Sequence, residues 1–345
     1  MKRNVVLTGD RPTGPLHLGH YVGSLRNRVE LQETCEQFIM LADIQALTDN
    51  MDRIALVQDS IVEVVLDYLA VGIDPAKTVV FVQSAVPALT ELTVHLLNIT
   101  SFERVRRNPT VKQEIQERNY GESTTAGFVI YPVSQAADIL AFKTDIVPVG
   151  ADQQPMIELA NETARRFNRL FNAAVFKECV GMIPDVGRLP GTDGKAKMGK
   201  SLKNAIYLGD PEEVVLEKIK QMYTDPTHLR VEDPGHLEGN VVFTYLDVFD
   251  DDAAGVAALK ERYMRGGLAD SVVKRRLRDV LVEVLRPMRQ RRIEYAADRE
   301  YVVQVLREGT AKARAVAEDT LAQVRDAMGI DYFMGQLNGR TSSVL

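Results

Sequence analysis

Short apolar runs alternate with longer amphipathic segments over the first half of the chain. The runs are β-branched or apolar and end at glycine, proline or polar residues, as buried strands do. They cover residues 5–9, 38–41, 78–83 and 145–150. Helical spacing of apolar positions covers residues 16–35, 53–71 and 155–168. This alternation predicts an α/β fold: a Rossmann-like, doubly wound parallel sheet with covering helices.

The pattern changes near residue 185. Residues 184–200 are rich in glycine, proline, aspartate and lysine, which predicts a mobile loop. Beyond residue 208 no strand alternation occurs, and long helical stretches dominate, for example 271–296 and 299–328. We therefore expect two domains. The first covers residues 1–205 and includes a mobile lysine loop over 188–205. The second is helical, over 206–345, and its last helix is a candidate to pack back on the first domain.

Composition narrows the class of protein. The chain has 345 residues, of which 45% are hydrophobic and 26% charged, and its net charge is −6. These values are those of a soluble globular protein, and they exclude a disordered chain and a nucleic-acid binder that is basic throughout, although a local basic patch remains open. No apolar run reaches the ~18 residues of a membrane span, and the N-terminal run is too short for a secretory signal. The two cysteines, Cys35 and Cys179, form no metal or disulfide pattern, so we expect a cytoplasmic protein without a membrane anchor.

Two histidines flank a glycine at the start of a predicted helix. His17 and His20 follow a strand and a loop rich in proline and glycine, and their spacing places both rings on one helical face. Helix N-termini bind phosphate groups, and Gly19 leaves backbone open to a flat base. We interpret the segment as a nucleotide site. The alternative is a pair of histidines that cap and pack the helix.

A second cationic segment lies in the predicted loop. Lys197-Met-Gly-Lys-Ser201, with Lys195 before it, suits a flexible loop that closes on ATP phosphates and stabilises the charge that develops during reaction. Together with Gly194 it also satisfies the phosphate-loop pattern of many NTPases. That pattern requires a buried strand before it and a helix after it, and neither is predicted here. A solvated basic loop is the remaining alternative.

Polar residues follow one face of a predicted helix near residue 131. Tyr131, Gln135 and Asp138 share that face, and the small or apolar residues around Asp138 predict that its carboxylate is partly buried. A buried carboxylate needs a donor, either from the protein or from a ligand. Residues 150–153, Gly-Ala-Asp-Gln, stand where a strand ends and a helix begins, which is where open parallel sheets bind ligands. Asp152 suits a ribose hydroxyl, or caps the helix, and Gln153 suits a small polar substrate.

These segments together resemble the class I aminoacyl-tRNA synthetases, and among them the bacterial-type tryptophanyl-tRNA synthetases. His17-Leu-Gly-His20 is similar to the His-Ile-Gly-His signature, and Lys197-Met-Gly-Lys-Ser201 to the Lys-Met-Ser-Lys-Ser loop. Tyr131-Pro-x3-Ala-Ala-Asp-Ile-Leu140 and Asp145-Ile-Val-Pro-Val-Gly-x-Asp-Gln153 resemble the tryptophan-specific core. The likeness continues to Ala327-Met-Gly329 and covers nearly the whole chain.

The resemblance implies a role for each matching residue. Asp138 would accept the indole N–H, and Tyr131 and Gln153 would hold the α-amino group of tryptophan. The residues implied to line the side-chain pocket are Leu7, Gln135, Val147 and Val149. Those implied to contact ATP are Arg11, Pro12, Thr13, Gly19, His20, Gly150, Ala151, Asp152, Leu189, Lys197, Met198, Gly199, Lys200 and Ser201. The implied catalytic residues are His17, His20, Lys197, Lys200 and Ser201.

The implied activity is that of a tryptophan–tRNA ligase. Tryptophan attacks the α-phosphate of ATP, pyrophosphate leaves, and the adenylate then esterifies the terminal adenosine of tRNA(Trp). Mg2+ would travel with ATP and would not be held in a protein cage. The resemblance also implies a homodimer that binds one tRNA across both subunits.

The chain departs from the family pattern at several positions. Gly199 replaces the central serine of the lysine loop, which predicts a looser loop. Leu7, Gln45 and Gln135 stand where relatives often carry phenylalanine, histidine and methionine, which predicts a roomier or more polar pocket. A tyrosyl-tRNA synthetase is the nearest alternative, although that enzyme would carry a tyrosine in place of Leu7. A catalytically weakened, synthetase-like tRNA-binding paralogue is the other, and Gly199 favours it.

Basic residues outnumber acidic ones over residues 274–292, and such a stretch suits contacts with tRNA phosphates. A solvated helix face is the alternative. The basic residues are Lys274, Arg275, Arg276, Arg278, Arg286, Arg289, Arg291 and Arg292. A second basic cluster, Arg104, Arg106 and Arg107, lies in the predicted α/β domain and is a candidate for the acceptor stem.

Overall fold

A five-stranded parallel sheet lies at the centre of the computed structural model, which describes residues 3–118, 124–183, 189–195, 198–199 and 202–332. The strands are β1 (Val5–Asp10), β2 (Glu36–Leu41), β3 (Thr78–Val82), β4 (Ile146–Pro148) and β5 (Val180–Met182). Their order in the sheet is β3-β2-β1-β4-β5, and all of the pairings are parallel. The strand order changes direction between β1 and β4: β2 and β3 extend the sheet on one side of β1, and β4 and β5 extend it on the other. In open α/β sheets, this switch point is where ligands bind.

The sheet confirms the predicted α/β fold and its first four strands, with bounds that differ by a few residues. The fifth strand, β5, was not predicted, because three residues with a central glycine carry no alternation. Strand β4 is shorter than the predicted run over 145–150. Proline ends it, since Pro148 cannot donate to a central ladder.

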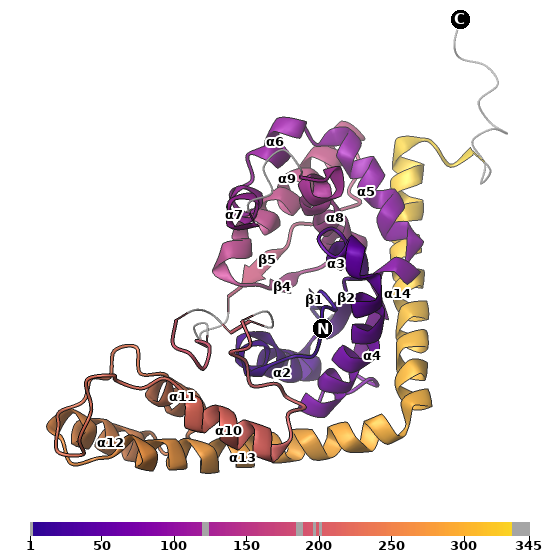
Figure 1. Ribbon diagram of the computed structural model, residues 1–345. Coiled ribbons are helices and arrows are strands. Elements are labelled where there is room, and N and C mark those ends of the chain that lie inside the picture. Colours follow the sequence, from indigo (N-terminus) through magenta and orange to yellow (C-terminus); the bar gives the residue numbers. More distant parts are fainter. Residues whose placement is uncertain (1–2, 119–123, 184–188, 196–197, 200–201, 333–345) are drawn as a thin grey trace, which may run out of the picture.

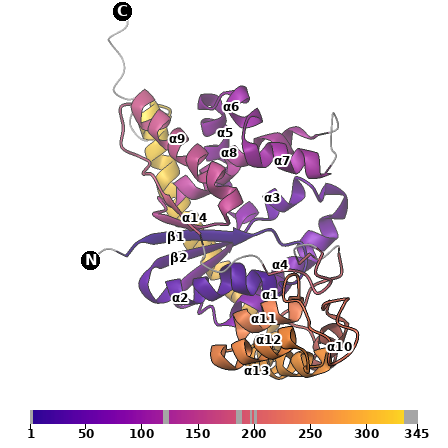
Figure 2. The ribbon, with the colours of Figure 1, turned by 90° about the vertical axis from the view of Figure 1, so that its left-hand side faces the viewer.

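Helices cover both faces of the sheet (Figure 2). Alternate side chains of β2 show the division. Ile39 lies in the apolar cluster beneath α4, while Phe38 and Met40 lie in the one beneath α5 and α8. On the first face lie α1 (Leu18–His20), the π-helix η1 (Tyr21–Leu25), α2 (Arg26–Thr34) and α4 (Ile54–Val71). On the second face lie α5 (Pro87–Ile99), α8 (Ala126–Ala141) and α9 (Gln154–Leu170).

Short helices carry the chain around the carboxyl ends of the strands. They are α3 (Asp43–Leu47), η2 (Met51–Arg53), η3 (Gln83–Ala85), α6 (Phe102–Arg106), α7 (Pro109–Arg118) and η5 (Ala151–Gln153). The helix predicted over 16–35 is present, but it starts at residue 18 and contains the single π turn η1. Such turns occur often at functional sites. Pro155 lies in the first turn of α9, as predicted.

Five helices form the rest of the described chain: α10 (Glu212–Gln221), α11 (Val241–Phe249), α12 (Ala253–Arg265), α13 (Asp270–Ala297) and α14 (Arg299–Met328). Helix α14 returns along the sheet and packs against β3 and α5 (Figure 1). The close approach depends on Gly309, because a Cβ there would lie 2.0 Å from the carbonyl oxygen of Val80. Thus α14 covers the edge strand of the sheet and joins both apolar clusters.

Within the described residues, no helix combines the length and the apolar character that a membrane crossing requires.

Candidate active site

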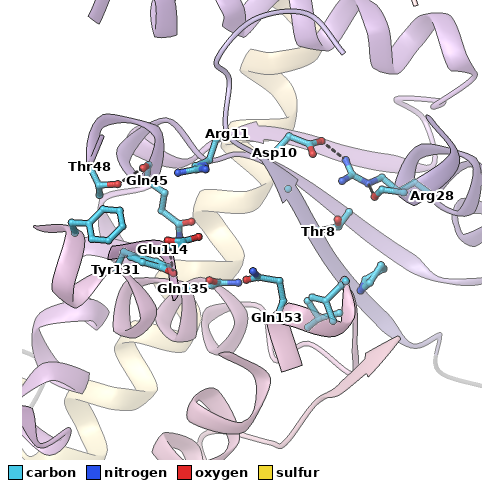
Figure 3. Close-up of a pocket in the computed structure, with 18 residues that line it drawn as sticks. Thr8, Asp10, Arg11, Arg28, Gln45, Thr48, Glu114, Tyr131, Gln135 and Gln153 are labelled. Carbon is cyan, nitrogen blue, oxygen red and sulfur yellow. Dashed lines mark hydrogen bonds and ion pairs between the residues drawn. The ribbon is translucent and has the colours of Figure 1, made fainter. Parts of the chain in front are cut away.

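A cavity of about 370 Å3 opens at the carboxyl ends of β1 and β4, on the switch point of the sheet. Its size is that of ordinary small-molecule sites. Four segments supply most of its wall (Figure 3). They are the end of β1 (Thr8, Gly9, Asp10, Arg11), the η1–α2 turn (Gly23, Ser24, Arg28), α8 (Phe128, Tyr131, Gln135) and the segment after β4 (Pro148, Val149, Gly150, Gln153). Gln45, Thr48, Glu114 and Val147 complete the wall.

The two signature histidines lie together beside this cavity rather than in its wall. The ring centroids of His17 and His20 are 3.8 Å apart, and the backbone N–H of His17 donates to His20 Nδ1 at 3.2 Å. His17 is buried, whereas His20 is half-buried and close enough to contribute to lowering the pKa of Asp10. The predicted face of two imidazoles is therefore present at the start of α1.

The segment after the lysine loop pairs with the first signature. Leu18 donates its backbone N–H to Ile206 O at 2.9 Å, and Leu208 donates to Leu16 O at 3.0 Å. Met198, which precedes the paired residues in the chain, also lies against the first signature. Its Cβ is 3.6 Å from the position that a Cβ on Gly19 would occupy. The open backbone predicted at Gly19 is thus bounded by Met198 and by the His17 ring. Segments about 180 residues apart in sequence meet at one place.

Part of the predicted lysine loop lies outside the described residues, namely Lys197, Lys200 and Ser201. Of its neighbours, Gly199 donates its backbone N–H to Asn204 Oδ1 at 2.9 Å. Leu189 and Met198 are buried in the apolar cluster that contains Leu16 and Leu18. Residues 202–208 form no helix, so the described part of this segment lacks the helix that an NTPase phosphate loop requires.

Asp138 is buried deep beside the cavity and is 1% exposed. Its Oδ2 accepts hydrogen bonds from Gln45 Nε2 at 2.7 Å and from Gln83 Nε2 at 2.9 Å. Its Oδ1 is buried and has no hydrogen-bond partner among the residues that the structure describes. Burial raises the pKa of this carboxyl to about 7, against the opposing effect of the two amide hydrogen bonds. The predicted burial of Asp138 is confirmed, and an acceptor remains for a ligand.

Most of the residues expected around a bound amino acid lie in the cavity wall: Tyr131, Gln135, Val147, Val149 and Gln153. The Tyr131 hydroxyl donates to Glu114 Oε2 at 3.1 Å, and Gln153 Nε2 donates to Asp152 Oδ2 at 3.2 Å. In the view of Figure 3, Gln135 stands between Tyr131 and Glu114 on one side and Gln153 on the other.

Leu7 precedes the part of β1 that lines the cavity. It is buried in the apolar cluster with Phe38 and Val147, and Val147 itself lines the cavity whereas Leu7 does not. The role of Leu7 in the side-chain pocket stays a prediction.

The residues expected to contact ATP divide into three groups. Arg11 and Gly150 line the cavity, and Arg11 also forms an ion pair with Asp49 at 3.1 Å. Gly19 and His20 belong to α1, beside Met198. Four others do not line the cavity: Pro12, Thr13, Asp152 and Leu189.

Four polar side chains in or beside the site were not found from the sequence. Arg28 is 2% exposed, yet it lines the cavity and donates to Asp10 Oδ2 at 2.7 Å and Ser24 Oγ at 2.8 Å. The Tyr68 hydroxyl donates to the same Asp10 oxygen at 2.6 Å. Glu114 and Gln83 are the other two. No local pattern marks these residues, because their partners come from other elements.

The basic cluster on α13 is largely engaged within the protein. Arg276 forms an ion pair with Asp250, Arg286 with Glu283 and Arg289 with Glu212. Arg291 donates to the carbonyl of Ala70, and Arg292 pairs with Asp67 and Glu63 of α4. In the second cluster, Arg104 pairs with Glu162, and Arg106 and Arg107 pair with Glu103.

Comparison with known proteins gives one consistent result. The family described as "tRNA synthetases class I (W and Y)" matches residues 1–286. The chain is 54% identical to the tryptophan–tRNA ligase of Clostridium longisporum, over 96% of this chain and 99% of that protein. It is 53% identical to that of Streptococcus pyogenes serotype M3, over 96% and 100%. A crystal structure of tryptophanyl-tRNA synthetase from Campylobacter jejuni, complexed with ADP and tryptophan, superposes with a TM-score of 0.82 at 32% identity, covering 94% of this chain and 99% of that one.

Proposed function

The chain belongs to the class I tRNA synthetases of the tryptophan and tyrosine group, and from this premise we propose how its residues share the work of the reaction. Its activity is that of a tryptophan–tRNA ligase: it couples tryptophan to tRNA at the expense of ATP. The assignment of individual residues below is our proposal.

The observation that carries the proposal is the buried carboxylate beside the cavity. Asp138 presents one oxygen without a partner, next to Gln45 and one turn from Gln135, both of which line the cavity. A buried acceptor left unpaired is costly, so a ligand that donates an N–H there gains selectivity over one that does not. The indole N–H of tryptophan is such a donor, and Val147 and Val149 supply apolar contact for its rings.

The polar end of the cavity suits the amino-acid head group. In this arrangement Tyr131 and Gln153 hold the α-amino group, with Glu114 beside the Tyr131 hydroxyl as a further acceptor for the ammonium charge. Tyr131 and Asp138 lie about two turns apart on α8. The amino acid is then fixed at two points, which leaves its carboxylate as the group free to react.

ATP occupies the neighbouring space between α1 and the segment after β4. The residues proposed to hold it are Arg11, Pro12, Thr13, Gly19, His20, Gly150, Ala151, Asp152, Leu189, Met198 and Gly199, together with Lys197, Lys200 and Ser201 of the lysine loop. The two histidines at the start of α1 are donors to the phosphates. The lysines place positive charge where negative charge develops.

Two steps complete the reaction. A carboxylate oxygen of tryptophan attacks the α-phosphorus, a new P–O bond forms, and the bond to the leaving pyrophosphate breaks. A ribose hydroxyl of the terminal tRNA adenosine then attacks the carbonyl carbon of the adenylate, and AMP leaves as the ester forms. Proximity of the two substrates in adjoining sites removes much of the entropic barrier. Mg2+ enters with ATP; among the described residues, no group of three or more histidine, cysteine, aspartate or glutamate side chains could hold a metal ion.

We further propose that residues 1–205 form the catalytic domain and 206–345 a tRNA-binding domain that reads the anticodon. A groove between α10 and α13 supports this division, because Lys220, Lys274, Arg275 and Arg278 line it against a single acidic residue, Asp270. Phosphate contacts are the natural use of such a surface. We also propose that the protein acts in the cytoplasm, as a homodimer that binds tRNA(Trp) across both subunits, as the resemblance to the family implies.

The test is amino-acid-dependent exchange of pyrophosphate into ATP, run separately with tryptophan, tyrosine and phenylalanine. Exchange with tryptophan alone supports the proposal, and exchange with tyrosine supports the tyrosyl alternative. Absence of exchange, with tRNA binding retained, supports a weakened paralogue. Replacing Asp138 by alanine should lower kcat/KM for tryptophan at least tenfold, about 1.4 kcal/mol. An unchanged value would remove Asp138 from the recognition role.

A further inference from the structure

Two glutamine side chains converge on a single oxygen of Asp138. Gln45 Nε2 donates to Oδ2 at 2.7 Å, and Gln83 Nε2 donates to the same oxygen at 2.9 Å. Gln83 also accepts the backbone N–H of Gln45 through its Oε1, at 3.3 Å. One side chain therefore holds both the carboxylate and the segment that carries the second amide.

The arrangement leaves the carboxylate asymmetric. Oδ2 has two donors, whereas Oδ1 is buried and has none. A carboxylate held at one oxygen by two donors cannot turn about its terminal bond without breaking both hydrogen bonds. The free acceptor is consequently fixed in direction before any ligand arrives.

The two amides come from the carboxyl ends of neighbouring strands. Gln45 lies on α3, which follows β2, and Gln83 starts η3, which follows β3. Both are thus fixed by the sheet rather than by the helix that carries Asp138. Gln83 is 1% exposed and does not line the cavity, while Gln45 does. The two donors are neutral amides, which leave the second oxygen of the buried carboxylate available; a lysine or arginine there would neutralise the carboxylate and compete for that oxygen.

We propose that Gln45 and Gln83 are positioning residues for amino-acid selection, which hold Asp138 so that Oδ1 alone faces the N–H of an indole substrate. This inference rests on the proposed function and deepens it. The glutamines act through Asp138 and need not touch the substrate's ring nitrogen themselves. Selection between amino acids then depends on residues from three separate elements, α3, η3 and α8.

The experiment compares two substrates in the full-length enzyme. One is tryptophan, and the other is benzothienylalanine, in which sulfur replaces the indole N–H. Gln83→Met keeps the length of the side chain and removes the donor. We expect kcat/KM for tryptophan in ATP–pyrophosphate exchange to fall about tenfold, as for loss of one transition-state interaction, while the analogue changes less than about twofold. KM for ATP should stay constant.

Gln37→Met is the matched control. Gln37 lies on β2 and is also 1% exposed. Its amide donates to Arg28 O on α2 and to Thr78 Oγ1 on β3, away from Asp138. We expect this variant to have a lower melting temperature and an unchanged ratio of kcat/KM for tryptophan to kcat/KM for benzothienylalanine. If Gln83→Met does not fold, Gln45→Met gives the same comparison from the half-buried cavity wall.

The outcomes separate the inference from its premise. Wild-type enzyme that fails to use tryptophan would end the proposed function. In the other case the wild-type enzyme uses tryptophan, but the glutamine variants lower kcat/KM for both substrates equally or for neither. That result would leave the function intact and overturn the positioning role. A double variant, Gln45→Met with Gln83→Met, should lose less than the product of the single losses, because both residues act on one carboxylate.

Discussion

Asp138 combines a buried charge with a role in recognition, and its ionisation links the two. Burial raises its pKa to about 7, so near neutrality the carboxyl is divided between both forms. Only the ionised form has the free acceptor that an indole N–H needs. The same shift also affects folding: the folded protein holds this proton to higher pH than the unfolded chain, so this group's contribution to stability decreases as pH rises from about 4 through 7.

We therefore expect kcat/KM for tryptophan to rise by about tenfold between pH 6 and pH 8, following the ionised fraction of one group near pH 7. The measurement is a pH profile of ATP–pyrophosphate exchange. Asp138→Asn supplies the control, because it does not titrate and should give a flatter profile. A profile that is equally steep in Asp138→Asn would assign the pH dependence to another group.

At the scale of elements, a buried ion pair joins the end of β1 to α2 and α4. Burial alone would raise the pKa of Asp10, but Arg28, with help from Tyr68 and His20, holds it at about 2. The pair lies at the cavity wall, as Figure 3 shows. Asp10 stays ionised at all ordinary pH values, and its contribution to stability is lost only as pH falls through about 2.

Arg28→Ala should lower the free energy of unfolding by about 3–5 kcal/mol, since it leaves Asp10 charged and unpaired in a largely buried site. Urea denaturation measures this loss. Replacing both partners, with Asp10→Leu and Arg28→Met, should recover most of it, because a well-packed apolar pair removes both desolvation costs. If the double variant is as unstable as the single one, the ion pair is not the source of the stability.

The contact of α14 with β3 gives a prediction that opposes helix propensity. In an exposed helix, Gly→Ala stabilises by roughly 0.5–1 kcal/mol. At Gly309 the added Cβ would lie 2.0 Å from Val80 O, so Gly309→Ala should lower the melting temperature. Gly127 of α8, where a Cβ would meet nothing within 4 Å, is the matched control and should show no loss. Equal effects at the two positions would contradict the close packing of α14.

At the scale of the whole molecule, α13 is tied to α4 by a short ionic network. Asp67 of α4 is 0% exposed; it accepts from Arg292 Nε at 2.8 Å and from the backbone N–H of Leu16 at 2.7 Å. Leu16 opens the segment that pairs with residues 206–208. One carboxylate thus connects the helical region, the sheet region and the segment before the signature histidines.

Arg292→Met should consequently destabilise the protein by several kcal/mol, about 3–5, because Asp67 is left as a buried charge without its cation. Arg286→Met, which removes an exposed pair with Glu283, should cost no more than about 1 kcal/mol. Thermal unfolding of the two variants checks the difference. Matching losses would show that surface charge on α13, rather than the tie to α4, sets stability.

Much of this molecule was predictable from the sequence because the relevant signals are local. Strands β1 to β4 follow from apolar runs, the histidine pair from spacing within one helical turn, and burial of Asp138 from its apolar neighbours. Strand β5 is too short to carry a pattern. Leu7 was placed in the pocket by resemblance alone, and that placement stays a prediction; the residue is buried in the apolar cluster that contains the cavity residue Val147.

The sequence by itself determined which reactive groups the chain carries and which sheet it forms. The groups are the two signature segments and a carboxylate among small residues, and the alternation of apolar runs and helices builds the parallel sheet. Tertiary structure alone decided how these parts act together. The two donors on Asp138 come from α3 and η3, the partner of Arg28 comes from β1, and Arg291 and Arg292 of α13 turn inward to α4. The physical reason is that hydrogen bonds and ion pairs depend on distance in space, and contacts between elements far apart in the chain leave no periodicity in the sequence.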